Sequence, residues 1–396
     1  MRRDGEQWQS IFLASPIKGR DLRIKVVNSD NPSLFEAVRE IVQSGEIDAD
    51  CIARHEADLT RLGVLIGAAE VSRPVVFHCW LTEPESGERA GHASHEDADL
   101  GDLVGAPVLV YQPPGTALPD VLRERVLLEK QFAWGAPESW FAPGCGRLWV
   151  EDPGTRILAV FSVPAHLESI VASLRPDEPP PSSLTAETSR LLRRANVLVT
   201  RGFAAHRAEE WERTCDEARR RFASDGFVNV EGLLHPLQLV ALRHYLREFV
   251  AEGHAELTKE ETVCYGAHNE GVCRYLHHQL SGLVGRIVGR EIKPSYTYFR
   301  TYRPGAVLER HLDREPSHYS ISFLVDYTPE SADRSPWPLC LEPGSGGVVP
   351  VFQRRGDGVF FEGIKVPHFR DRLAAGCTST SVFFEYVPKE YSGPLR

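Results

Sequence analysis

This sequence lacks three features: long apolar runs, an excess of positive charge, and closely paired cysteines. No run approaches the roughly 18 apolar residues that a membrane-spanning helix needs, so we expect no membrane partner. The formal net charge of -10 argues against a nucleic-acid partner, because such a partner requires a basic face. The eight cysteines contain no CxxC pair, which argues against a closed zinc site. Since no apolar signal segment follows the charged N-terminus, we expect reduced thiols and a cytoplasmic location.

The length and composition indicate a globular protein of more than one domain. The chain has 396 residues, of which 42% are hydrophobic and 25% charged. That length exceeds one ordinary domain. A strongly charged helix predicted at 206–222 is typical of a connector, so we place a boundary near residue 205. This divides the chain into residues 1–205, a substrate-recognition or scaffold region, and residues 206–396.

Two segments of the N-terminal region have the same pattern. Residues 34–66 and 167–199 each begin with an apolar-periodic helix, continue through a polar break into a second helix, and end in a short β-branched stretch. This order predicts an α/β region with two winged-helix-like repeats. It resembles the small winged-helix peptide-binding chaperones of ribosomal-peptide modification systems. The alternative is a pair of helical hairpins that pack on a neighbouring element. Residues 75–81 and 148–161 between and beside the repeats are predicted strands.

The C-terminal half changes from helical to β character. Residues 236–251 predict an amphipathic helix, and residues 276–288 predict a second one. Short strands separated by Gly and Pro turns are then predicted at 295–302, 317–327, 339–343, 346–352, 356–363 and 378–387. Close spacing of short strands is typical of a sandwich or barrel, so the whole chain is predicted to be α+β.

Three residues in this β region form a candidate metal site. His311 and Asp313 are two positions apart, and residues i and i+2 of a strand point to the same face. His368 follows a Gly-Asp-Gly strand and supplies a third ligand from another part of the sheet. Two neutral imidazoles and one carboxylate form the facial triad that holds iron(II) with open coordination positions. The alternative is that both histidines are structural members of an all-β core.

The motifs around these ligands resemble those of a known enzyme family. A Tyr-Arg-Pro-Gly turn at 302–305 precedes His311, and Pro367 directly precedes His368. Together with the ligands they resemble the iron(II)/2-oxoglutarate dioxygenases, in particular the prolyl-hydroxylase-like and phytanoyl-hydroxylase-like groups, over roughly residues 222–390. The resemblance implies a double-stranded β-helix (jelly roll) with flanking helices, and an oxidoreductase that uses Fe(II), 2-oxoglutarate and dioxygen. It also implies hydroxylation rather than halogenation, because related halogenases lack the carboxylate ligand that Asp313 provides.

One departure from the family pattern concerns the cosubstrate. The family places an Arg or Lys about ten residues after the distal histidine to bind the far carboxylate of 2-oxoglutarate, but residues 376–381 contain no cation. The replacements that we consider are Arg370, Arg300 and Arg372, in that order, since residue 370 returns to the face of His368 on an extended segment. Further candidates to hydrogen-bond the cosubstrate are Tyr298, Tyr302 and Ser322.

The sequence leaves three functions open. The first is a hydroxylase acting on a peptide, an amino-acid side chain or another small molecule. The second is a cupin-like metalloenzyme that does not use 2-oxoglutarate, which the missing cation suggests. The third is a non-catalytic β-sandwich binding module.

Overall fold

The computed structural model describes residues 10–17, 20–27, 31–44, 49–61, 75–81, 100–126, 141, 144–258, 263–331, 333–344 and 346–395. Up to residue 200 the elements are β1 (Ser10–Ile17), β2 (Arg20–Val27), α1 (Pro32–Ser44), α2 (Ala49–Arg61), a 3-10 turn (Leu100–Asp102), β3 (Leu103–Gly105), β4 (Leu109–Gln112), α3 (Asp120–Val126), β5 (Gly146–Glu151), β6 (Leu158–Val163), a second 3-10 turn (Ala165–Leu167), α4 (Glu168–Ser173), α5 (Ala186–Arg194) and β7 (Leu198–Thr200).

The remaining elements alternate helices with short strands and then become almost entirely β. They are α6 (Phe203–Asp225), β8 (Phe227–Val230), α7 (Pro236–Ala251), β9 (Glu256–Thr258), β10 (Cys264–His268), α8 (Gly271–Val288), β11 (Ile292–Tyr302), β12 (Leu308–His311), β13 (Tyr319–Thr328), β14 (Leu339–Leu341), β15 (Val349–Val351), β16 (Gly358–Phe361), β17 (His368–Arg370) and β18 (Thr378–Pro388). None of the helices within the described part of the chain is long and apolar enough to cross a membrane.

The chain forms two compact units, Met1–Val75 with Glu248–Leu257, and Val76–Arg247 with Thr258–Arg396. In the first unit β1 and β2 form an antiparallel hairpin that is followed by α1 and α2. One face of α1 is buried through Leu34, Phe35 and Val38. The two helices agree with the first half of the predicted repeat at 34–66, whose β-branched end lies outside the described residues.

The second unit begins with a small α/β module. Strands β4, β5 and β6 form an antiparallel sheet, and β3 pairs with β7. Helices α4 and α5 and strand β7 follow the helix, helix, strand order expected for the second repeat. The winged-helix interpretation itself stays a prediction. Residues 75–81 do not form the predicted strand: they make only isolated bridges, from Phe77 to Phe141 and from Trp80 to Ser162.

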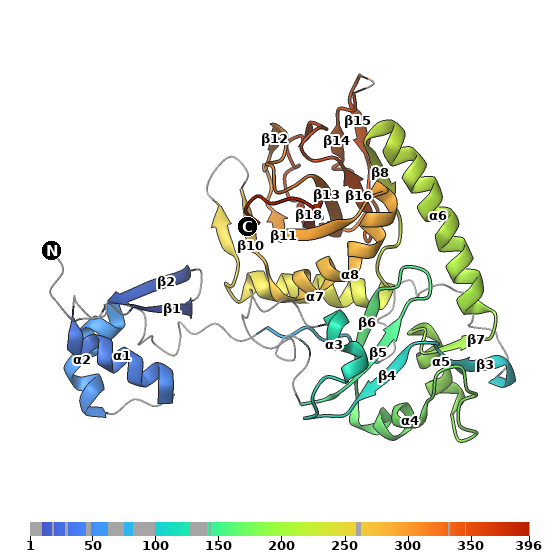
Figure 1. Cartoon of the computed structure of the whole chain (residues 1–396), viewed down its shortest axis with the longest axis horizontal. Helices are drawn as coiled ribbons and strands as arrows, with labels where there is room; N and C mark the ends of the chain where they lie inside the picture. The colour runs from blue at the N-terminus through green and yellow to red at the C-terminus, as the bar shows by residue number, and fades with distance from the viewer. Residues whose placement is uncertain are drawn as a thin grey trace. The chain divides into compact units, whose positions relative to one another are not determined.

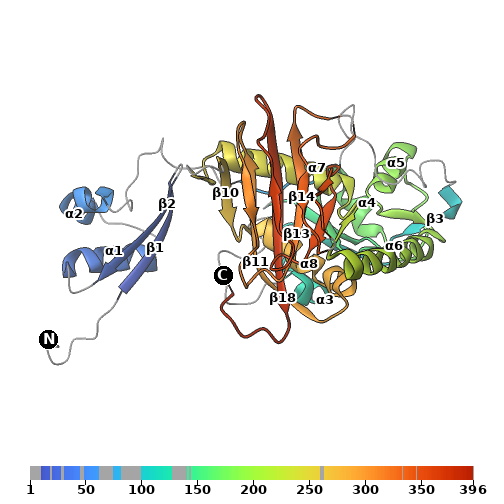
Figure 2. The same cartoon turned by 90° about the horizontal axis from the view of Figure 1, so that it is seen from above.

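The β-rich half of the second unit has a jelly-roll-like arrangement of two sheets (Figure 1). The larger sheet contains β8-β16-β13-β18-β11-β10 in that order, and the smaller contains β12-β17-β14-β15. From β11 to β14 consecutive strands alternate between the sheets, and from β15 to β18 they alternate again. Figure 2 shows β10, β11, β18 and β13 of the larger sheet side by side. Buried residues of both sheets, among them Leu341, Val359 and Phe361, form a core between them.

Helices flank the larger sheet, as the resemblance implied. Helix α8 lies against its outer face, where the ring of His277 makes a 2.8 Å hydrogen bond to the carbonyl oxygen of Glu385. Glu270 begins this helix by accepting hydrogen bonds from the backbone nitrogens of Val272 and Cys273. Gly226 ends α6 with a φ of 75°, a left-handed conformation that favours glycine, and the chain turns directly into β8.

Buried hydrogen bonds join the small module to the β-rich half. The side chain of Gln238 on α7 donates to the carbonyl oxygen of Val160 on β6 at 2.8 Å, and the hydroxyl of Tyr275 on α8 donates to that of Leu158 at 2.6 Å. The predicted boundary near residue 205 falls at the start of α6 and stays a prediction.

Candidate metal centre

Strand pairing brings the two candidate histidine ligands together. His311 ends β12 and His368 begins β17, and the two are direct partners in the antiparallel register of these strands. Their ring centroids lie 4.2 Å apart. Asp313 follows β12, and its backbone N–H donates to the carbonyl oxygen of Gly363 at 2.9 Å, which turns the chain so that its carboxylate faces both rings.

The three side chains converge on one point. Oδ1 of Asp313 lies 3.6 Å from Nε2 of His311 and 3.6 Å from Nε2 of His368. The ligand atoms all lie within 4.8 Å of one another, and within the described residues this is the group of His, Cys, Asp and Glu that could hold a metal ion.

Backbone carbonyls orient both rings for metal binding. Nδ1 of His311 lies 2.7 Å from the carbonyl oxygen of Glu309, and Nδ1 of His368 lies 3.1 Å from that of Val366. A carbonyl oxygen only accepts, so each Nδ1 carries the proton and each Nε2 presents a lone pair. Burial lowers the pKa of His368, and the positive His311 would lower it further, whereas Asp313 opposes the shift. His368 is therefore a neutral ligand near pH 7.

A buried polar chain holds the carboxylate ligand. Oδ2 of Asp313 accepts a hydrogen bond from the Ser320 hydroxyl at 2.8 Å, and that hydroxyl also lies 2.6 Å from Oε2 of Glu385. Burial raises the pKa of Glu385 well above its usual range, and the charge of Asp313 raises it further. A neutral Glu385 can donate to Ser320, whose single proton is then directed to Asp313. Gly363 leaves room for this arrangement, because a Cβ there would lie 2.3 Å from Oδ2 of Asp313.

The donor set fits iron(II). Two imidazole nitrogens and one carboxylate oxygen occupy one side of a metal and leave other positions open. The side chain of His311 is 38% exposed while that of His368 is only 5% exposed, so the site opens on the His311 side. A closed structural zinc site would instead require a fourth protein ligand.

Arg370 lies deeper between the sheets, on the same strand as His368. It is 1% exposed. Its Nη1 donates to the carbonyl oxygen of Trp337 at 2.8 Å, and its Nη2 lies 3.1 Å from Oε1 of Gln353 and 3.3 Å from Oγ of Ser322. Its guanidinium also stacks over the Trp337 ring at 4.9 Å.

No carboxylate pairs with this buried cation among the residues that the structure describes. Every partner of the Arg370 guanidinium is neutral, and its Nε has no hydrogen-bond partner in the same part of the chain. Burial lowers the pKa of Arg370 to about 10. A buried charge without a counterion is unfavourable, so the surroundings of Arg370 are suited to an anionic ligand.

Four further residues were predicted from the sequence to bind the cosubstrate: Ser322, Tyr302, Arg300 and Tyr298. Ser322 hydrogen-bonds the guanidinium, and Tyr302 packs against Trp337 at 5.0 Å between ring centroids. Burial raises the pKa of Tyr302 to about 12, and the charges of Arg300 and Arg370 oppose this shift. Arg300 lies over the ring of Tyr298 at 5.4 Å.

Arg372 lies outside this group. It is exposed, and its Nη1 donates to the carbonyl oxygen of Gly305 at 2.9 Å. Its assignment to the cosubstrate therefore stays a prediction with the weakest support of the three arginines.

The structure adds polar residues that the sequence did not single out. Ser379 and Ser381 on β18 are buried, and their hydroxyls have no partner within the described residues. They pair directly with Tyr302 and Arg300 across β11 and β18. They lie in the segment 376–381, in which the sequence has no cation. The only sequence signal for their shared face was their alternation along the strand. Gln353 was also missed.

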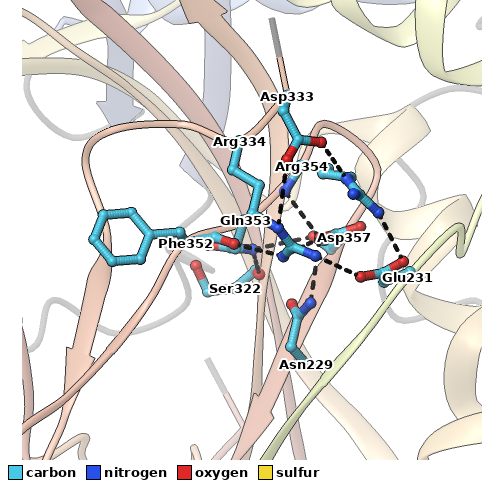
Figure 3. Close-up of polar contacts among 9 residues, drawn as sticks. All are labelled: Asn229, Glu231, Ser322, Asp333, Arg334, Phe352, Gln353, Arg354 and Asp357. Atoms are coloured by element: carbon cyan, nitrogen blue, oxygen red, sulfur yellow. Dashed lines mark hydrogen bonds and ion pairs between the residues drawn. The ribbon is translucent and has the colours of Figure 1, made fainter. Parts of the chain in front are cut away.

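A polar network surrounds Gln353 at the turn before β16 (Figure 3). Asp357 is 2% exposed, and its Oδ2 accepts from the backbone nitrogen of Arg354 at 2.8 Å and from Nδ2 of Asn229 at 3.2 Å. Burial raises the pKa of Asp357 to about 6, against the opposing effect of these bonds and of Arg334. Arg334 donates to the carbonyl oxygen of Phe352 at 2.8 Å. These contacts fix the turn 352–357.

Comparison with known proteins gives structural matches only. No protein-family model and no curated protein matches the chain. A crystal structure of the non-heme alpha ketoglutarate dependent carbocyclase SnoK from nogalamycin biosynthesis is 17% identical over 44% of this chain and 85% of its own, with a TM-score of 0.38. A Pseudomonas putida prolyl-4-hydroxylase is 20% identical over 43% of this chain and 98% of its own, with a TM-score of 0.37. HygX from Streptomyces hygroscopicus, solved with nickel, 2-oxoglutarate and hygromycin B, is 13% identical over 44% and 88%, with a TM-score of 0.36. The structural matches fall in the class that the sequence motifs resemble.

Proposed function

We propose that this chain is an iron(II)- and 2-oxoglutarate-dependent dioxygenase that hydroxylates a peptide, an amino-acid side chain or another small molecule. The observation that carries the proposal is the pairing of an open metal triad with a buried guanidinium that has only neutral partners among the described residues. His368 and Arg370 are two residues apart on β17, which corresponds to roughly 6–7 Å along a strand. That distance suits a five-carbon diacid whose oxo-acid end lies at the metal.

The residues of the site have distinct roles in this proposal. His311, Asp313 and His368 hold the metal, with both Nε2 lone pairs fixed by backbone carbonyls. When bound, iron(II) and 2-oxoglutarate would supply the oxidising chemistry that couples formation of succinate and carbon dioxide to hydroxylation of a substrate C–H bond.

The binding pocket is formed by Arg370 together with neighbouring hydroxyl groups. Arg370 binds the far carboxylate through a charged hydrogen bond in a dry pocket. The hydroxyls of Tyr302, Ser379 and Ser381 would donate to the same group, with Arg300 as a second cation; this is supported by the direct strand pairing of Tyr302 with Ser379 and of Arg300 with Ser381. The substrate reaches the metal from the exposed side of His311.

The two other functions have less support. The cupin-like interpretation was motivated by a missing cation, and Arg370 supplies a buried one. The binding-module interpretation does not account for two histidines whose Nε2 lone pairs and one carboxylate converge on one point.

The proposal is tested by measuring succinate formed from 2-oxoglutarate under air. We expect the parent protein to form succinate only when iron(II) is added, and Asp313→Ala to form none, because the variant lacks the carboxylate ligand. Failure of the parent to form succinate under any of these conditions would favour the cupin-like function.

A further inference from the structure

Gln353 connects three parts of the pocket that lie far apart in the sequence. It follows β15 and is 2% exposed. Its Nε2 donates to the carbonyl oxygen of Ser322 on β13 at 2.8 Å and to that of Asp357 at 3.1 Å. Its Oε1 accepts from Nη2 of Arg370 at 3.1 Å. Every polar atom of this buried side chain is therefore used.

The orientation of this carboxamide follows from its partners. Two carbonyl oxygens on one side can only accept, and a guanidinium on the other side can only donate. A flipped amide would place its N–H groups against the guanidinium and its oxygen against two carbonyl oxygens. The Gln353 amide can thus bind the Arg370 guanidinium in one orientation of the amide only.

The backbone around Gln353 is fixed on both sides. The carbonyl oxygen of Gln353 accepts from the backbone nitrogen of Ser335 at 2.8 Å, and the network in Figure 3 holds the turn that follows it. The turn is also bonded to β13: the backbone nitrogen of Leu324 donates to the carbonyl oxygen of Asp357, and that of Gly356 donates to the carbonyl oxygen of Leu324. The side chain of Gln353 therefore has little freedom to follow Arg370 if the guanidinium moves.

The chemical type of this residue matters as well as its position. A carboxylate at position 353 would accept the same hydrogen bond from Arg370 but would neutralise its charge within the protein, and, like Met, it would lose the two bonds that Gln353 donates to the Ser322 and Asp357 carbonyls. An amide accepts the bond and leaves the charge uncompensated. The other two groups that fix the guanidinium, the Ser322 hydroxyl and the Trp337 carbonyl, are also neutral acceptors and leave its charge uncompensated.

We propose that Gln353 is a positioning residue that makes the pocket selective for 2-oxo acids with a distal carboxylate. It fixes the Arg370 guanidinium through a neutral contact and so keeps the positive charge for the ligand. This inference rests on the proposed function. In this role Gln353 does not contact the metal, dioxygen or the hydroxylated substrate.

The test compares two ligands on the anaerobic, iron(II)-loaded full-length protein by calorimetry. The ligands are 2-oxoglutarate and 2-oxovalerate, which has the same five-carbon chain but no distal carboxylate. We expect Gln353→Glu to weaken 2-oxoglutarate binding by about thirtyfold, because the new carboxylate competes for Arg370. Binding of 2-oxovalerate should change by less than about twofold, since it does not need the charge.

A second variant and a pH series separate position from charge. Gln353→Met removes the contact without adding charge, and we expect an intermediate loss for 2-oxoglutarate of about fivefold. In Gln353→Glu the loss should grow as pH rises through the titration of the new carboxyl group, which neither the parent nor Gln353→Met should show.

The matched control is Gln238→Glu. Gln238 is also a buried amide that donates to a carbonyl oxygen, but it joins α7 to β6 and has no part in the pocket. It should leave the ratio of the two affinities unchanged. Equal weakening of both ligands in Gln353→Glu, or no weakening of either, would overturn the inference while leaving the proposed function standing. If the parent does not prefer 2-oxoglutarate to 2-oxovalerate, both the proposed function and the inference fail.

Discussion

Replacement of either triad histidine by alanine is expected to abolish stoichiometric iron(II) binding. A three-residue site has no spare ligand, and within the described residues no other His, Cys, Asp or Glu joins the group. The measurement is metal content after anaerobic loading with iron(II) and gel filtration of His311→Ala and His368→Ala. His311 is the cleaner variant, because its side chain is 38% exposed and its removal leaves a smaller packing defect than removal of His368.

The control for this experiment is His318→Ala. His318 is half-buried, lies in the loop that follows Asp313, and has its Nδ1 2.7 Å from the carbonyl oxygen of Glu315. It therefore resembles the triad histidines in its local bonding but lies outside the metal group. The control should bind one iron per chain. Full iron affinity in both triad variants would disprove the ligand assignment.

Loss of the Arg370 guanidinium is expected to raise the 2-oxoglutarate concentration required for half-maximal turnover by roughly ten- to a hundredfold. This corresponds to about 1.5–3 kcal/mol for a lost charged hydrogen bond. Iron binding should be nearly unchanged, because no ligand is altered. The variants are Arg370→Ala and Arg370→Met, the second of which fills more of the buried volume.

The same measurement on Arg300→Ala and Arg372→Ala ranks the rival cations. We expect a smaller effect from Arg300, which is half-buried beside Tyr298, and the smallest from Arg372, which is exposed. If the parent and all three alanine variants consume 2-oxoglutarate alike, the far carboxylate is bound elsewhere. That result would bring the cupin-like function forward again.

The sequence predicted most of the helices and strands that build the site, because their signals are local. The alternation of residues along an extended segment placed Arg370 on the face of His368, and the structure buries both on β17. His311 and Asp313 were predicted to point to the same face of one strand, and this was only partly correct. The strand ends at His311, and a hydrogen bond from Asp313 to Gly363 turns the carboxylate inward instead.

The parts that the sequence did not reveal depend on contacts between distant residues. Gln353 lies in a turn, where alternation gives no information, and its role follows from partners on β13 and β17. Trp337 lies in the segment between β13 and β14, and its carbonyl oxygen accepts a hydrogen bond from Arg370 on β17. His268 ends β10 and stacks on Tyr298, with 5.3 Å between ring centroids. Only the long-range pairing of β10 with β11 could have shown this.

The most direct test of the account is the affinity of the full-length protein for 2-oxoglutarate under anaerobic conditions, measured by calorimetry with and without iron(II). In the proposed binding mode one end of the cosubstrate lies at the metal and the other at Arg370, so the two contacts should reinforce each other. We expect one molecule bound per chain in the presence of iron(II), and an affinity at least about tenfold lower without the metal. An affinity that is the same with and without iron(II), or no binding to the iron-loaded protein, would contradict the central claim.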